Sequence, residues 1–256
     1  MIERRLVSRP VSTIGTLIAP RVTQEEGPRI VTEGLVGHWD AGNPYSYPGT
    51  GTTWTDLSGN AINGTLTNGP TYSSDRGGVF TLDGVNDHVN CGNNALTRFN
   101  NTAAFTVEGW AYFSAITGYP AIAGQDTVGS PRNGYELLAL ETSSTTAMWG
   151  FERFGAGTAA GAYGPAVNKS ELTNRWVHLV GTYNGSTLTL YENSISIATA
   201  TGVTTSNNNT TTPLYFGRLF SSYLKGAIAI VRIYSRALSS AEITQNFNAT
   251  RGRFGL

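Results

Sequence analysis

The feature that most constrains the fold is a two-residue hydrophobic alternation that runs through the chain from Gly34 onward. It is clearest in residues 105–113 (FTVEGWAYF), where Phe105 and Val107 fall on one face of a strand and Trp110 and Tyr112 on the other. Because large side chains occupy both faces, this segment predicts a strand that is covered on both sides.

Similar segments predict further strands at 135–141, 146–154, 175–183, 187–192 and 225–235. Asn184-Gly185 separates two of them and predicts a type I′ hairpin turn. Regular spacing with turn residues between strands favours an antiparallel sandwich over a βαβ fold.

One short helix is predicted near the C-terminus. Ser239 and Glu242 form a capping box, in which each side chain accepts from the other residue's backbone N–H. Ile243 and Phe247 then lie four apart on one face, and Gly252 is expected to end the helix. The helix should pack at the edge of the sandwich.

Composition excludes several function classes. The chain has 256 residues, no net charge and 13% charged residues, against roughly a quarter in an average soluble domain. This balance argues against nucleic-acid binding, which needs a basic patch to neutralise phosphates. A single cysteine, Cys91, cannot form an internal disulfide or a cysteine-based zinc site. No apolar run reaches the ~18 residues of a membrane span, and the start lacks the apolar core of a signal peptide.

Residues 1–33 differ from the rest and predict an extended N-terminal arm ahead of a domain at 34–256. Prolines at 10, 20 and 28 forbid a long helix, and the segment has too little apolar periodicity to fold alone. We expect the arm either to wrap its own domain or, in the favoured alternative, to dock onto another subunit. The arginines expected to contact that partner are Arg4, Arg5, Arg9, Arg21 and Arg29.

The strand segments resemble the laminin G-like and concanavalin A-like lectin jelly rolls. The matching segments follow the family order at 34–40, 54–60, 63–66, 80–84, 87–89, 105–110, 176–178, 181–186, 231–239 and 242–243. The resemblance covers about residues 34–250. It implies an all-β, two-sheet antiparallel jelly-roll sandwich with a concave ligand-binding face and usually no catalysis.

A narrower resemblance is to jelly rolls in structural proteins of tailed phages, notably marine ones. It is carried by residues 40–44 (DAGNP), 47–54 (YPGTGTTW), 242–249 (EITQNFNA) and 251–255 (RGRFG). It implies a virion structural protein, such as a capsid decoration, neck or tail component. Its partners would be capsid or tail subunits, or further copies of itself, and it would be located in the virion.

Two other functions stay open. The first is a carbohydrate-binding module that attaches a phage or a cell to a polysaccharide. The second is a glycan hydrolase, which is disfavoured because the paired glutamates of glucan-cleaving relatives are absent. Glu136 and Glu141 are five apart and fall on opposite faces of a strand, and Glu108 is interpreted as structural. We therefore predict no catalytic residues.

Calcium-binding relatives often carry an acidic residue in a Gly-x-Ile-Asp-Glu-Val pattern. Here Ala229 and Ile230 replace both acids. Asp56, Asp83 and Asp87 remain as calcium candidates, although turn capping is the favoured interpretation. No cofactor is therefore predicted. The histidines are too scattered for zinc, and His178 is expected to make one buried hydrogen bond.

For sugar binding, the sequence offers Trp149, Phe151 and Tyr163 near a Gly/Ala-rich segment at 155–164, which is interpreted as a loop. The alternative is that Trp149 and Phe151 fill the core and that Tyr163 lies on a loop. Residues 206–212 (SNNNTTT) are expected to form an exposed polar spacer.

Overall fold

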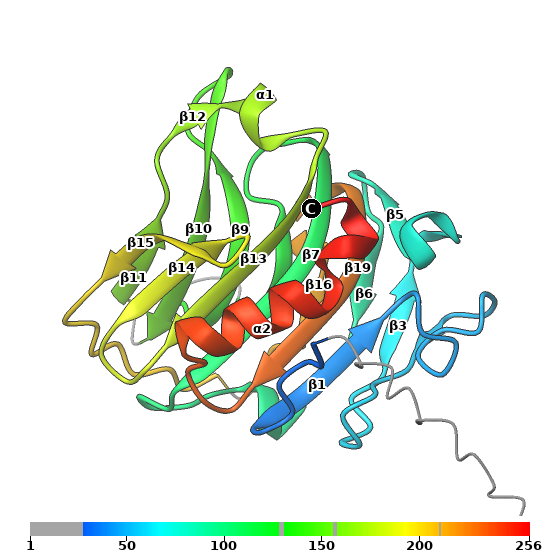
Figure 1. The fold of residues 1–256 in the computed structure, drawn as a ribbon. Helices are drawn as coiled ribbons and strands as arrows, with labels where there is room; N and C mark the ends of the chain where they lie inside the picture. Colours follow the sequence, from blue (N-terminus) through cyan, green and yellow to red (C-terminus); the bar gives the residue numbers. More distant parts are fainter. Residues whose placement is uncertain (1–27, 128–130, 156–157, 210) are drawn as a thin grey trace, which may run out of the picture.

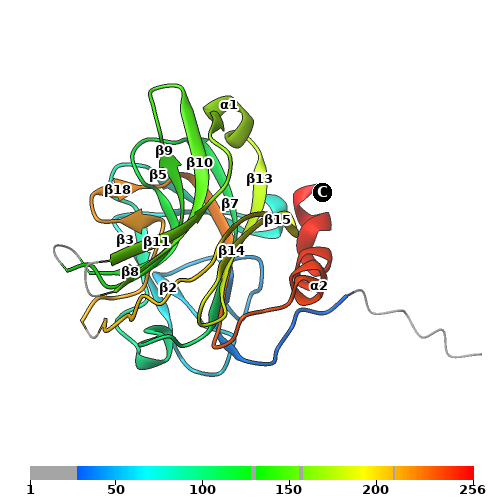
Figure 2. The ribbon, with the colours of Figure 1, turned by 90° about the vertical axis from the view of Figure 1, so that its left-hand side faces the viewer.

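The computed structural model describes residues 28–127, 131–155, 158–209 and 211–256. Two antiparallel sheets lie face to face, as Figures 1 and 2 show, which confirms the predicted all-β sandwich. The eight-stranded sheet, called sheet A, has the order β15-β14-β13-β7-β19-β5-β4, with β1 paired to β19. Its strands are β1 Leu35–Asp40, β4 Thr71–Ser73, β5 Val79–Asp83, β7 Phe105–Ala115, β13 Trp176–Tyr183, β14 Leu188–Glu192, β15 Ile195–Ala200 and β19 Lys225–Tyr234.

The nine-stranded sheet, called sheet B, has the order β11-β10-β9-β8-β16-β6-β3-β2, with β12 paired to β10. A separate hairpin joins β17 Arg218–Leu219 to β18 Ser222–Tyr223. The strands of sheet B are β2 Thr53–Trp54, β3 Gly64–Thr67, β6 His88–Asn90, β8 Ala121–Asp126, β9 Gly134–Glu141, β10 Thr146–Gly155, β11 Thr158–Tyr163, β12 Val167–Asn168 and β16 Tyr215–Phe216.

The core lies between the inner faces of the sheets and is rich in aromatic rings. Trp54 meets Phe80 and Phe216 edge to face, with ring centroids 4.8 and 5.9 Å apart. A Cβ on Gly181 would lie only 2.2 Å from the Phe151 ring, so only glycine lets sheet A approach this ring. Such aromatic pairs contribute about 0.5–1.5 kcal/mol each beyond the area they bury.

The outer face of sheet A is covered by helix α2 (Ser240–Thr250), which Figure 1 shows lying across the strands. Ser239 caps it and forms the predicted capping box with Glu242. The helix does not end at Gly252. The chain continues as the 3₁₀ turn η3 (Arg251–Phe254) and reverses at Gly255, whose φ of 79° is in the left-handed region.

The helix is held down by an apolar cluster on the outer face of sheet A. The fully buried Trp110 ring stacks on Phe254 at 4.1 Å and on Phe247 at 5.7 Å between centroids. Its indole N–H donates to the Thr250 hydroxyl. Of the large residues predicted on the second face of this strand, Trp110 therefore lies beneath the helix.

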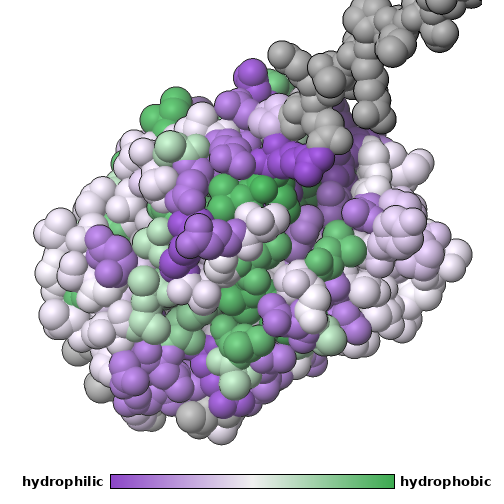
Figure 3. Space-filling model, turned by 60° about the horizontal axis from the view of Figure 1, so that its bottom comes forward, coloured by the Kyte–Doolittle hydropathy of each residue, from purple (hydrophilic) through white to green (hydrophobic). Residues whose placement is uncertain are grey.

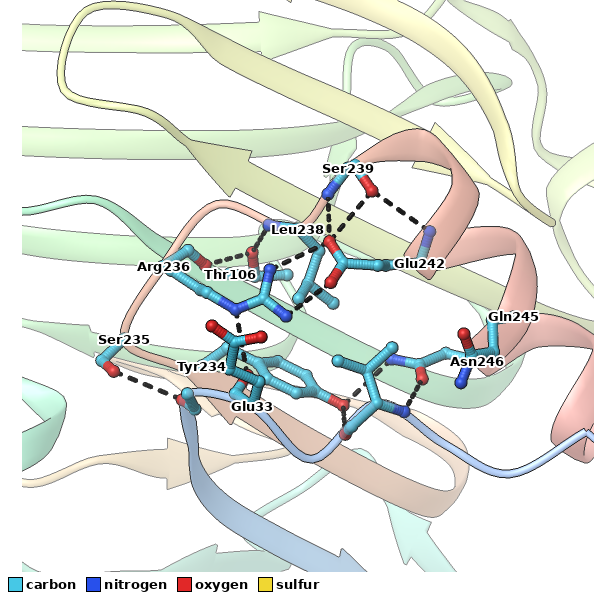
Figure 4. Close-up of polar contacts among 12 residues, drawn as sticks. Glu33, Thr106, Tyr234, Ser235, Arg236, Leu238, Ser239, Glu242, Gln245 and Asn246 are labelled. Carbon is cyan, nitrogen blue, oxygen red and sulfur yellow. Dashed lines mark hydrogen bonds and ion pairs between the residues drawn. The ribbon is translucent and has the colours of Figure 1, made fainter.

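The described start of the chain is tied to α2 and β19, as Figure 4 shows. Asn246 accepts from the Val31 N–H at 2.7 Å, and the Tyr234 hydroxyl donates to the Val31 carbonyl. Gln245 donates to the carbonyl of Arg29, the one predicted arm arginine among the described residues. The backbone groups of Arg29, Val31 and Glu33 thus bond to this chain's own domain. Arg4, Arg5, Arg9 and Arg21 lie outside the described residues.

Two segments predicted as loops have a different structure from the predicted one. Thr158–Tyr163, within the segment interpreted as a loop, is strand β11, paired with β10. Residues 206–212 are not an exposed spacer, because Asn207 and Asn209 are buried and their side chains bond the carbonyls of Arg98 and Gln125. Burial of such amides requires these partners.

The turn between β13 and β14 also differs from the predicted type I′ turn. Gly185 has a positive φ of 102°, but Asn184 does not have one. The Asn184 side chain instead accepts from the backbone N–H groups of Ser186 and Thr187. In this Asx-type turn, the Asn184 side chain supplies the hydrogen-bond acceptor for the backbone N–H groups of the loop.

Figure 3 shows the end of the sandwich that lies at the bottom of Figure 1, with an apolar band running between hydrophilic residues. The surface at this end is therefore mixed. Among the described residues, no helix is both long enough and apolar enough to cross a membrane.

Candidate functional site

A groove of about 900 Å³ lies on the outer face of sheet A, and we call it the aromatic groove. It crosses β4, β5, β19, β7 and β13 beside the end of η3. Its lining includes Asp83, Tyr112, Asn174, Trp176, Lys225 and Phe254.

The floor of the aromatic groove is built from rings on neighbouring strands. Tyr112 of β7 and Trp176 of β13 are cross-strand partners with centroids 5.8 Å apart, and both are half-buried. Trp176 also lies 4.8 Å from Phe254. Gly226 completes the floor because its φ is 152° and a Cβ there would lie 1.9 Å from the Tyr112 carbonyl oxygen.

The rim is polar and carries charges of both signs. The Asp83 carboxylate accepts from the N–H groups of Val85 and Asn86, which lowers its pKa and keeps it ionised. Lys225 and Asn174 are exposed at the opening. The Tyr112 hydroxyl donates to Asn174 at 3.3 Å. An aromatic floor with a few fixed polar groups is the usual construction of a small-molecule site.

The sequence did not single out Tyr112 or Trp176 as ligand-binding residues. A signal was present, because Tyr112 alternates away from the core residues Phe105 and Val107. What the sequence could not show is that α2 covers Trp110 on the same face and leaves Tyr112 open.

The predicted sugar-binding aromatics lie elsewhere. Phe151 is fully buried and Trp149 is 2% exposed, so both fill the core, as the alternative interpretation held. The Trp149 indole donates to Glu192 beside a smaller hollow of about 200 Å³. Tyr163 is 39% exposed and lies on sheet B, where its hydroxyl donates to Glu152.

Carboxylates gather on the outer face of sheet B. Glu136 and Glu152 are cross-strand partners, and Arg132 pairs with Glu136 and Asp126. Burial, followed by the neighbouring Asp126 carboxyl group, raises the pKa of Glu136 well above its usual range. Burial also raises the pKa of Asp126.

This carboxyl cluster is closed to solvent in the described structure. Asp126, Glu136 and Glu152 are at most 9% exposed, and the Arg132 guanidinium lies over the Phe154 ring at 3.5 Å. A hydrolytic site needs open carboxyl groups on both sides of a sugar bond. The arrangement here ties residues 131–133 to the sheet.

A second buried network lies under α2. Glu108 pairs with Arg232 at 2.5 Å and accepts from Asn246 at 2.9 Å. Burial raises the pKa of Glu108, but the charge and hydrogen bond of Arg232 together with the neighbouring His178 outweigh burial and lower this pKa to about 2. His178 is 3.8 Å from Glu108, and both its ring nitrogens lack a hydrogen bond, so the predicted bond is not present. Ring stacking on Trp110 at 5.0 Å holds His178 instead.

The predicted calcium candidates have local backbone partners. Asp56 accepts from the N–H groups of His38, Ser58 and Ile62, and Asp87 accepts from the Asp83 N–H. Ala229 is buried in the apolar cluster under α2. Among the described residues, no group of three or more His, Cys, Asp or Glu side chains is arranged to hold a metal ion.

We expect the protein to lose stability as the pH falls below 6.5. Burial and the nearby Arg232 charge lower the pKa of His38 from 6.5 to about 4, so the folded state binds this proton less well than the unfolded chain. The contribution of His38 to the free energy of unfolding is complete above pH 6.5 and is lost between pH 6.5 and 4, on the order of 3 kcal/mol. Below pH 4.5, loss of the Glu108 contribution adds to it.

Urea unfolding at pH 7.5, 5.5 and 4.0 measures this dependence, with His38→Gln as the test variant. The variant should show a flatter free energy of unfolding between pH 6.5 and 4.5. An equally steep dependence in both proteins would assign the effect to another group.

Comparisons with known proteins place the chain in a family. Residues 83–244 match the model of the concanavalin A-like lectin/glucanases superfamily. Comparison with curated protein sequences found no significant match.

Solved structures share the fold. The binding domain of Paraclostridial mosquitocidal protein 1 is 18% identical with a TM-score of 0.63, covering 85% of this chain and 52% of that one. Domain 4 of the Geobacillus stearothermophilus arabinanase AbnA is 16% identical with a TM-score of 0.60, covering 84% and 98%. A Trypanosoma rangeli sialidase is 15% identical with a TM-score of 0.60, covering 86% and 33%. This chain thus spans about half of the first of these and a third of the last. Since the matched segment is more than half of its length, the chain belongs to the concanavalin A-like lectin/glucanases superfamily.

Proposed function

We propose that the chain is a non-catalytic, lectin-like domain that binds a glycan in the aromatic groove and is displayed on a phage particle through its N-terminal segment. The observation that carries the glycan proposal is the pairing of Tyr112 with Trp176 on an open face of sheet A. Sugar rings have apolar C–H faces and polar edges. An aromatic floor with amide and charged groups at the rim complements both.

The comparisons support a binding role at the level of the fold. Domain 4 of the arabinanase was solved in complex with arabinotriose, and the other structure is the binding domain of Paraclostridial mosquitocidal protein 1. Because both are under 20% identical to this chain, they do not indicate which glycan it would bind.

The non-catalytic part of the proposal rests on the carboxyl cluster of sheet B. Its acids are buried, and Asp126 and Glu136 pair with Arg132. Two carboxylates, those of Asp75 and Asp83, line the aromatic groove. One oxygen of Asp83 accepts from the backbone N–H groups of Val85 and Asn86. The proposal involves no metal. Asp56 and Asp87, which could act as metal ligands, accept hydrogen bonds from backbone N–H groups in turns.

Trp176→Ala is expected to lower the affinity for the bound glycan about 5- to 30-fold, because stacking on a ring of this size contributes on the order of 1–2 kcal/mol. The full chain is first screened on an array of bacterial polysaccharides and oligosaccharides, with calcium and with chelator. The strongest hit is then titrated by calorimetry against Trp176→Ala, Tyr112→Ala and a control, Tyr45→Ala, whose side chain is 84% exposed outside the groove.

Equal affinities in Trp176→Ala and Tyr45→Ala would move the glycan site away from the aromatic groove. An array without any binding, in calcium or in chelator, would contradict the glycan proposal itself.

The virion part of the proposal is supported by the phage-like segments and by the separate character of residues 1–27. Light scattering of the full chain and of a chain starting at Pro28 tests it. The cut is made there because Val31 is buried and bonded to Asn246. Assembly of the full chain alone supports an anchoring segment, whereas two identical monomers would favour a free-standing glycan-binding module.

A further inference from the structure

Two long sheet edges lie on the same side of the sandwich. β15 ends sheet A and β11 ends sheet B, each with six residues. The opposite edges are β4, with three residues, and β2, with two. Short edges resist pairing with another chain, but long ones invite it.

The edge of β15 carries none of the usual protection. Its sequence, ISIATA, has no charge and no proline, and Ile195 is 68% exposed. Within the described part of the chain, the backbone of β15 bonds only to β14. Its outer row of N–H and C=O groups is therefore open to a further strand.

The chain contains a segment suited to this edge. Residues 11–18 (VSTIGTLI) lie between Pro10 and Pro20, carry no charge and include five β-branched residues out of eight. Such a composition favours a strand, and prolines at both ends limit its length. Eight residues suffice to cover the six of β15.

The geometry favours the segment of a neighbouring copy over the chain's own. In Figures 1 and 2, α2 lies between the blue start of the described chain and β15. A segment of the same chain must pass over a helix about 10 Å wide and then across strands about 4.8 Å apart. Residues 19–27 span at most about 30 Å, so this path leaves the linker almost fully stretched.

We propose that residues 11–18 of one copy add as an edge strand to β15 of a neighbouring copy. Main-chain hydrogen bonds give this contact its affinity, as in other cases of strand addition. The inference rests on the anchoring role proposed above and assigns that role a site. Glycan binding in the aromatic groove does not depend on it.

The first test places lysines on the open edge. Ser196→Lys with Thr199→Lys changes two exposed positions of β15, and charges on an edge strand oppose pairing. Light scattering of the full chain should show self-association weakened at least tenfold, while the exposed-loop control Thr117→Lys leaves it unchanged. If the β15 lysines leave association intact, the site is wrong even when deletion of residues 1–27 abolishes assembly.

The second test identifies the occupant. A full chain with Ile14→Cys is mixed with one carrying Thr199→Cys and treated with a short bis-maleimide; the native Cys91 is buried. Covalent dimers are expected, and none with Thr117→Cys in place of Thr199→Cys. A single chain with both cysteines that links only within itself would assign the strand to its own domain and overturn the inference. A full chain that is monomeric at every concentration would overturn both this inference and the anchoring role.

Discussion

Arg232→Ala is expected to lower the free energy of unfolding by about 3–5 kcal/mol, because it leaves the Glu108 carboxylate buried without its charge partner. Both side chains are 1% exposed and meet at 2.5 Å. Glu108 would keep only the Asn246 amide as a close donor. A buried charge without a partner costs far more than the lost bond itself.

Urea unfolding at pH 7 measures this loss, with Lys169→Ala as the matched control. Lys169 pairs with Glu141 where both side chains are 20–28% exposed, and such a pair contributes at most about 1 kcal/mol. The double variant Arg232→Met with Glu108→Met should recover much of the stability, because no charge remains to be buried. A loss for Arg232→Ala no larger than that for Lys169→Ala would mean that water reaches Glu108.

The alternation of residues determines much of this fold and can be read from the sequence. The strands around Phe105, Trp176 and Leu188 all follow it, and they predict an antiparallel sandwich because each needs a covered inner face. Even Arg153 obeys the pattern. It shares the inward parity of Phe151 and is buried, with its guanidinium 4.5 Å from the Tyr183 ring and bonded to the Thr205 carbonyl.

Pairings between distant strands could not be predicted in the same way. Tyr112 and Trp176 form one floor only because β13 pairs with β7 in a particular register. Glu136 and Glu152 likewise share a face through the pairing of β9 with β10. Period-two patterns tell which face a residue occupies, but not which strand lies beside it.

The position of helix α2 on sheet A could not be predicted from the sequence either. Ser239 and Glu242 predict where α2 begins, but no local signal tells which strands it crosses. Its docking decides that Trp110 is buried while Tyr112, two residues on along the same face, stays open to a ligand. The sequence therefore points to Trp149 and Phe151 as candidate ligand-binding aromatics, whereas the structure places both rings in the core.

Trp110→Ala is expected to lower the free energy of unfolding by about 3–5 kcal/mol, the usual cost of removing a large buried aromatic side chain. The indole touches α2 and η3 through Phe247, Phe254 and the Thr250 hydroxyl. Its loss should loosen the C-terminal helix before the sandwich, since the core between the sheets is untouched. Hydrogen exchange should therefore quicken first in residues 240–254.

The same substitution connects the core to the proposed glycan site. Phe254 lies between Trp110 and Trp176, so a loosened η3 removes one wall of the aromatic groove. Glycan affinity in Trp110→Ala should fall together with protection of residues 240–254, while Trp110→Phe, which keeps a ring on Phe254, should retain most of both. Fast exchange with unchanged affinity would show that Tyr112 and Trp176 bind without the support of the C-terminal turn.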